Sequence, residues 1–154
     1  MPRVTLGSFV IDVPTSWTLS TVILVGPPDE TPPGKGLPTT KAVRPFQRNL
    51  IATMEQVDPG TTIDVYLKRQ IDGLRQAGVS RSERAKPEKV QLQDGEEGVL
   101  LEQIIIGPTG ERVRQMQLIC IKEDVAHTLI ASHLDGPTFD AVRADYRLML
   151  LSFR

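Results

Sequence analysis

The chain has 154 residues, of which 40% are hydrophobic and 24% are charged, and its formal net charge is −1. This composition is typical of one folded domain, and the near-neutral charge excludes a strongly basic surface that would attract nucleic acid or an anionic membrane. The single cysteine, Cys120, excludes an internal disulfide and a cysteine-based zinc site, and no apolar run approaches the length of a membrane-spanning helix.

The first third of the chain has strand patterns interrupted by a proline-rich segment. Residues 3–13 alternate well enough for a pair of strands or one bent strand, and 16–25 predict a further strand that stops at Gly26. The proline-rich stretch 27–45 is predicted to be a surface loop, followed by a strand at 48–57. The N-terminus lacks a continuous apolar segment with a small-residue cleavage site, so we expect a cytoplasmic protein.

Two helices and four more strands are predicted in the remainder. Thr61 or Thr62 caps the first helix, which ends near Gly78 and has an apolar stripe of Ile63, Leu67, Ile71 and Leu74. The strands are predicted at 80–92, 99–107, 111–124 and 125–134, the middle two joined as a hairpin through the Pro-Thr-Gly turn at 108–110. The last helix begins near 137, with a predicted buried stripe of Phe139, Val142, Tyr146, Met149 and Phe153.

This order of elements predicts an α+β fold in a single domain spanning 1–154: a curved antiparallel sheet of about six or seven strands with two helices packed on one face. Three strands, at 20–25, 99–106 and 113–121, carry aliphatic residues on both faces, although a strand covered on one face should alternate. Two helices on one face leave the other apolar face open. We therefore expect the loop, a second copy of the chain in a homodimer, or another partner to cover it.

The histidines and the cysteine are not spaced as in known catalytic or metal-binding motifs. His127 and His133 have the same parity on one strand and lie roughly 20 Å apart, too far to share a metal, so structural histidines are favoured. Cys120 lies in an apolar strand and is better explained as a small core residue. No nucleophile motif is present. We expect no enzyme activity, no metal and no cofactor.

Two glutamines are less usual. Gln70 flanks the apolar stripe of the first helix, and Gln117 lies in mid-strand among large aliphatic residues. Each could pair with a backbone group or point into water. Alternatively, both could provide donors and acceptors on an otherwise apolar surface, which would suit a partner such as a transmembrane helix outside a membrane.

Four segments of the chain are distinctive: FVIDVPTSWTLSTVILV, TTIDVYLKRQIDGLRQ, VLLEQIIIGPTGERVRQMQLICI and the terminal LMLLSFR. Together they resemble the DcrB-like family, whose fold is like that of PsbP and Mog1. Within that family, the chain is most similar to the Eag chaperones of type VI secretion. The resemblance implies a bacterial cytoplasmic chaperone or adaptor, often dimeric, that shields the hydrophobic N-terminal segments of a secreted effector before the effector is loaded on the secretion spike.

The resemblance also implies an apolar groove. Its positions fall here on Val22, Leu24, Gln70, Val113 and Gln117. The alternative is a Mog1-like or PsbP-like binding module that docks a folded protein, and an enzyme or small-ligand binder is least favoured. Neither nucleic acid binding nor stable membrane insertion is expected.

Overall fold

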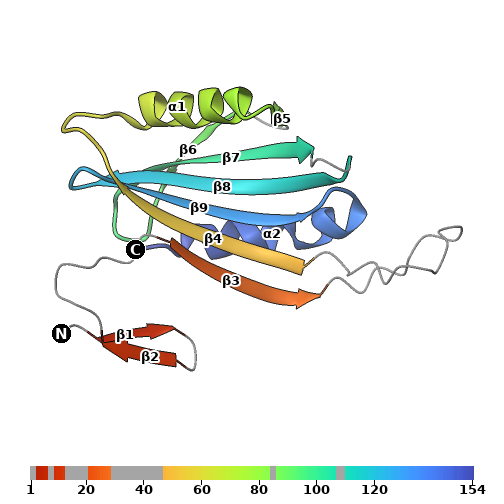
Figure 1. Ribbon diagram of the computed structural model, residues 1–154, viewed down its shortest axis with the longest axis horizontal. Helices are drawn as coiled ribbons and strands as arrows, with labels where there is room; N and C mark the ends of the chain where they lie inside the picture. The colour runs from red at the N-terminus through yellow and green to blue at the C-terminus, as the bar shows by residue number, and fades with distance from the viewer. Residues whose placement is uncertain (1–2, 7–8, 13–20, 29–46, 84–85, 107–109) are drawn as a thin grey trace, which may run out of the picture.

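A computed structural model describes residues 3–6, 9–12, 21–28, 47–83, 86–106 and 110–154 (Figure 1). Strands β1 (Arg3–Leu6) and β2 (Phe9–Asp12) form an antiparallel pair, one of the two arrangements that the alternating pattern of residues 3–13 predicted. The predicted proline-rich loop at 27–45 lies outside the described residues, except that Pro27 and Pro28 end β3.

The other strands form one seven-stranded antiparallel sheet. Its order is β3-β4-β9-β8-β7-β5, and β6 pairs with β7 beside β5. The strands are β3 (Thr21–Pro28), β4 (Gln47–Gln56), β5 (Ser80–Glu83), β6 (Glu88–Gln91), β7 (Glu97–Ile106), β8 (Arg112–Lys122) and β9 (Val125–Leu134). The helices are α1 (Ile63–Gln76) and α2 (Pro137–Leu151). The predicted fold class, α+β with an antiparallel sheet and two helices, is confirmed.

The first helix has the ends that its sequence predicted. The Thr62 side chain accepts a hydrogen bond from the Val65 amide at 3.3 Å, and Asp64 places a negative charge in the first turn. After the last turn, Gly78 has a φ of 72°, which glycine adopts without the steric cost of a Cβ atom. Local sequence therefore determines where α1 begins and ends.

The helices lie on opposite sides of the sheet, which differs from the prediction that both pack on one face (Figure 1). Tyr66 of α1 packs with Leu101 and Ile119. Phe139 and Leu150 of α2 pack with the cluster that contains Leu118, Met116 and Cys120. Alternate side chains of β8 therefore meet different helices, which explains why this strand is apolar on both faces.

The buried stripe of α2 differs from its prediction at one position. Phe139 and Leu150 are fully buried, whereas Met149 is 38% exposed. Leu150 is eleven positions after Phe139, which is about three helical turns, so both side chains point to the same side of the helix. Phe153 packs on the same core from beyond the end of α2.

The segment predicted as one strand at 80–92 forms two short strands instead. β5 pairs with the C-terminal half of β7, and β6 pairs with its N-terminal half. Pro87 stands immediately before β6 and lacks the N–H that a continuous ladder would need.

Candidate functional site

A cavity of about 520 Å³ lies between α1 and the sheet, and we call it the α1 groove. Its apolar lining consists of Leu67, Ile71, Leu74, Val79, Ile105 and Ile130, with Gly73 between them. Four glutamines complete the lining: Gln70, Gln103, Gln115 and Gln117. None of these residues is ionisable, so the groove offers apolar surface and neutral amides.

The four glutamines form one hydrogen-bonded network. Gln103 Nε2 donates to Gln115 Oε1 at 3.0 Å and to Gln117 Oε1 at 3.5 Å. Gln117 Nε2 donates to Gln70 Oε1 at 2.8 Å, which joins β8 to α1. Gln115 Nε2 in turn reaches Ser132 Oγ at 3.2 Å. Pairing of this kind lets the amides be buried, because each of the four glutamines takes part in at least one hydrogen bond with another glutamine.

The network continues to charged residues at its two ends. At one end, Arg81 Nε of β5 donates to Gln103 Oε1. At the other, Gln70 Nε2 donates to Thr128 Oγ1 at 3.2 Å, and the Tyr66 hydroxyl donates to Glu55 Oε2 at 3.0 Å. Burial raises the pKa of Tyr66 above 10.0, so the hydroxyl keeps its proton at neutral pH.

An apolar surface extends from the groove to the edge of the sheet. Gln117 is paired in register with Ile130, Ile130 with Ile51, and Ile51 with Ile23, so these side chains form one row across β8, β9, β4 and β3. Ile23 is 60% exposed and Val25 of the same face is 56% exposed. We call Ile23, Val25 and Ile51 the β3–β4 shelf.

The structure brings together two of the five residues predicted to line one groove. Gln70 and Gln117 are hydrogen bonded in the α1 groove. Val113 faces the same side of the sheet, paired with Ile105 and Leu134, but does not line the cavity.

Val22 and Leu24 lie on the opposite face, because they pair with Ala52 and Leu50, which pack against the α2 core. The expectation that all five residues share one surface is therefore wrong. Their neighbours Ile23 and Val25 occupy the face of the groove.

Sequence reasoning missed Gln103, Gln115 and Arg81. A usable signal existed for the two glutamines, because they lie equally far before and after Thr109, the centre of the predicted hairpin turn. That symmetry places them opposite each other, as the observed pairing of Gln103 with Gln115 shows. Arg81 lies outside the hairpin, and its position depends on the pairing of β5 with β7.

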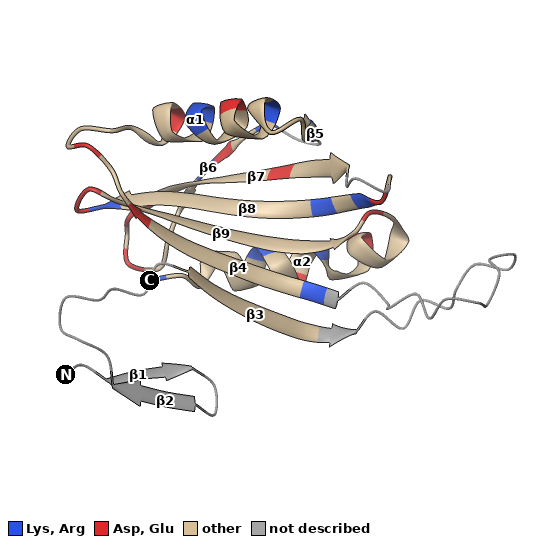
Figure 2. Cartoon of the chain, in the orientation of Figure 1, with Lys and Arg blue, Asp and Glu red and all other residues tan. Residues whose placement is uncertain are grey.

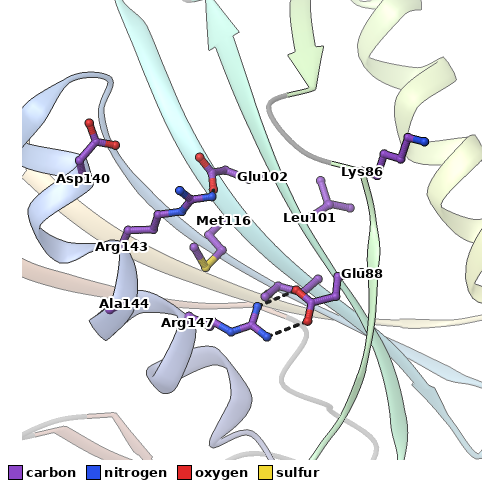
Figure 3. A pocket seen from close by; sticks show the side chains of 10 residues that line it. Lys86, Glu88, Leu101, Glu102, Met116, Asp140, Arg143, Ala144 and Arg147 are labelled. Carbon is purple, nitrogen blue, oxygen red and sulfur yellow. Dashed lines mark hydrogen bonds and ion pairs between the residues drawn. The ribbon is translucent and has the colours of Figure 1, made fainter.

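A second cavity, of about 410 Å³, lies between α2, β6 and β7 on the other side of the sheet (Figure 3). Its lining includes six ionisable residues: Lys86, Glu88, Glu102, Asp140, Arg143 and Arg147. Glu88 accepts two hydrogen bonds from Arg147, both at 2.8 Å, which lowers the pKa of the Glu88 carboxyl. We call it the α2 cavity.

A network of ion pairs around the buried Glu102 and Arg114 forms part of the wall of the α2 cavity. Glu102 is buried and lies 2.7 Å from Arg143 and 3.4 Å from Arg114. Arg114 also contacts Asp135 at 2.8 Å and Asp140 at 3.0 Å. By contrast, the central parts of β8 and β9 carry no Lys, Arg, Asp or Glu (Figure 2).

The cysteine and the histidines occupy structural positions. Burial raises the pKa of the Cys120 thiol to about 11, so it is uncharged at neutral pH. The ring of His133 is buried and bonds the Leu134 carbonyl at 2.9 Å, while His127 lies against Phe153 with ring centroids 5.3 Å apart. Within the described ranges, no three His, Cys, Asp or Glu side chains are grouped to hold a metal ion. Neither helix of the described part combines the length and hydropathy needed to span a membrane.

No protein-family model and no curated protein sequence matches the chain. The solved structures that are similar to it include the following two. The first is PA94, a protein of unknown function from Pseudomonas aeruginosa, with a TM-score of 0.67 at 12% identity; the match covers 100% of this chain and 96% of PA94. The second is cyanobacterial PsbP (CyanoP) from Synechocystis sp. PCC 6803, with a TM-score of 0.55 at 14% identity, covering 94% of this chain and 97% of CyanoP. The fold is PsbP-like. At these identities, the similarity shows the fold alone.

Proposed function

We propose that this protein is a non-enzymatic binding protein that holds an apolar helical segment of a partner on the α1 side of its sheet. The observation that carries the proposal is the α1 groove, which has no ionisable residue in its lining and continues into the β3–β4 shelf. A partner surface that is also uncharged and apolar loses the least solvation there.

The dimensions of the open surface favour a helix as the bound element. α1 packs over β8 and β5 and also contacts Thr128 of β9 and Glu55 of β4. The row of Ile130, Ile51 and Ile23 on the same face of β9, β4 and β3 continues beside it. Neighbouring strands are about 4.8 Å apart, so β9 and β3 are separated by about 10 Å, the diameter of one helix. An apolar helix satisfies its own backbone hydrogen bonds and needs few polar partners from the groove.

The partner segment that fits this chemistry best is a transmembrane segment that has not yet entered a membrane. The resemblance to Eag chaperones supports a secreted effector of type VI secretion as its source, shielded in the cytoplasm before loading on the secretion spike. The shelf covers only one side of such a helix. A second copy of the chain, in a homodimer, is the partner we expect on the other side.

The test uses two neighbouring residues with nearly equal exposure. Ile23, at 60% exposed, faces the groove side, and Leu24, at 58%, faces the α2 side. The probe is a fluorescent synthetic helix of about 20 leucines and alanines with lysines at both ends. We expect Ile23→Asp to weaken its binding at least about tenfold, because a charge facing a desolvated apolar helix is costly, while Leu24→Asp changes it less than about twofold.

Circular dichroism should show both variants folded, since both side chains are exposed. Light scattering of the complex measures how many copies surround one helix. Equal losses in the two variants, or failure of the wild type to bind the helix, would contradict the proposal. The alternative, docking of a folded protein through the α2 cavity, predicts instead that Arg147→Ala weakens partner binding and Ile23→Asp does not.

A further inference from the structure

The hydrogen-bond network under α1 has a direction, and Arg81 sets it. A guanidinium group has only donors, so the atom of Gln103 that faces Arg81 Nε must be its oxygen. The Gln103 nitrogen then points the other way, toward Gln115 and Gln117. Both N–H groups of Gln103 are donated, and each receiving atom must be an amide oxygen.

The same logic continues along the chain of contacts. Because Gln117 turns its oxygen to Gln103, its nitrogen faces Gln70, and Gln115 likewise turns its nitrogen toward Ser132. Gln70 then receives a hydrogen bond at its oxygen and donates from its nitrogen to Thr128. The orientation of each amide is thus fixed by the neighbour that lies nearer to Arg81 in the network.

The far end of the network requires the same direction. Thr128 and Gln70 lie near enough to the Tyr66 hydroxyl to lower its pKa by hydrogen bonding, and this hydroxyl donates to Glu55 at 3.0 Å. An ionised carboxylate only accepts hydrogen bonds. The network therefore runs from a cation that can only donate to an anion that can only accept, and hydrogen bonds aligned in this way strengthen one another.

With this orientation, the groups left unpaired in the groove are N–H donors and not acceptor oxygens. Each amide nitrogen carries two N–H groups, and Gln115 and Gln117 each donate one of them to a described residue. Within the described part of the chain, their second N–H groups have no acceptor. An N–H without an acceptor in an apolar groove costs more than a carbonyl oxygen that uses one of its two lone pairs.

We infer that Arg81 is a positioning residue that makes the α1 groove a hydrogen-bond donor surface. The groove therefore selects apolar helices that carry an acceptor oxygen among their apolar side chains. This inference rests on the proposed function and specifies the partner class. A helix with only aliphatic side chains binds more weakly, because it leaves the N–H groups of Gln115 and Gln117 without an acceptor.

The test compares two synthetic helices that differ in one central residue. One carries O-methylserine, whose ether oxygen accepts but cannot donate, and the other carries norvaline, which has nearly the same shape without the oxygen. We expect the wild type to bind the O-methylserine helix about fivefold more tightly, the effect of roughly one hydrogen bond between apolar helices. In Arg81→Met, we expect this ratio to fall to about one, with binding of the norvaline helix retained.

Two controls separate positioning from a general effect of charge or stability. Arg81→Lys keeps a donor-only cation and should restore the preference, and Arg69→Met removes an exposed charge of α1 and should leave it unchanged. Gln103→Met removes the link between Arg81 and the two β8 glutamines, so it should also abolish the preference. A preference that survives in folded Arg81→Met or folded Gln103→Met, or a wild type with no preference, overturns the inference. Failure of the wild type to bind either helix contradicts the proposed function instead.

Discussion

The two faces of this sheet bury polar groups of different kinds. Under α1 they are glutamine amides and hydroxyls, joined in a network whose ions lie at its ends. Under α2 they are ions, with the buried Arg114 and Glu102 held among Asp135, Asp140 and Arg143. Both arrangements pair buried polar groups with one another, but they differ in what they leave for a partner.

The difference follows from the cost of desolvation. A buried ion that loses its counter-ion is strongly destabilising, because its desolvation is no longer compensated. The α2 network therefore stabilises the fold only when all of its ions are paired with one another. Neutral amides cost less to bury and can rearrange their second hydrogen bonds. An open groove for an apolar partner can therefore hold glutamines but not ions. We interpret the α2 network as structural and the α1 network as a binding surface.

The largest expected effect comes from breaking the ionic network. Arg114→Met leaves the buried Glu102 and Asp135 with one cation fewer, and we expect it to lower the free energy of unfolding by about 3 kcal/mol. Urea unfolding followed by circular dichroism measures this change. Arg143→Met is the control, because its side chain is 52% exposed and its pair with Glu102 reaches the surface. We expect a loss below about 1 kcal/mol there; equal losses would mean that burial does not set the strength of this network.

How much of this could be predicted from sequence depends on how local the determinants are. The ends of α1 follow from Thr62 and Gly78, and the β7–β8 hairpin follows from a turn between two apolar runs. Gln70 and Gln117 were identified because an amide among aliphatic residues is unusual within one element. These features depend on residues close in sequence.

The face of the sheet to which each side chain points could not be predicted, because it depends on the register between strands that are distant in sequence. Whether Leu24 or Ile23 faces the groove follows from successive pairings through β4 and β9 to β8, and shifting one strand by a single residue reverses the answer. From sequence alone, the apolar residues on both faces of β8 predict that one face of the sheet is uncovered. In the structure they reflect a central strand with a helix on each side.

A smaller effect is expected from removing an amide under α1. Gln117→Leu leaves Gln70 Oε1 without its donor, and we expect a loss of about 1 kcal/mol in the free energy of unfolding, partly offset by the added apolar contact. The same variant should bind the norvaline helix at least as well as the wild type does. Gln76→Leu, at the exposed end of α1, is the matched control and should change neither quantity. If Gln117→Leu lowered the free energy of unfolding as much as Arg114→Met does, the amide network and the ionic network would not differ in their contribution to stability.

The smallest effect is a pH dependence confined to the α2 side. Burial lowers the pKa of His127 below 6.5, with a lesser contribution from Lys122, so the unfolded chain takes up its proton before the folded one does. Stability from this group is complete above about pH 6.5 and falls as the pH drops through the folded pKa. The α1 groove has no ionisable lining, so helix binding should stay constant from about pH 6 to 8. Urea midpoints across this range should slope downward toward acid in the wild type and less in His127→Phe, which keeps an aromatic ring beside Phe153. Equal slopes in the two proteins, or helix binding that follows the stability curve, would show that the two faces do not respond to pH separately.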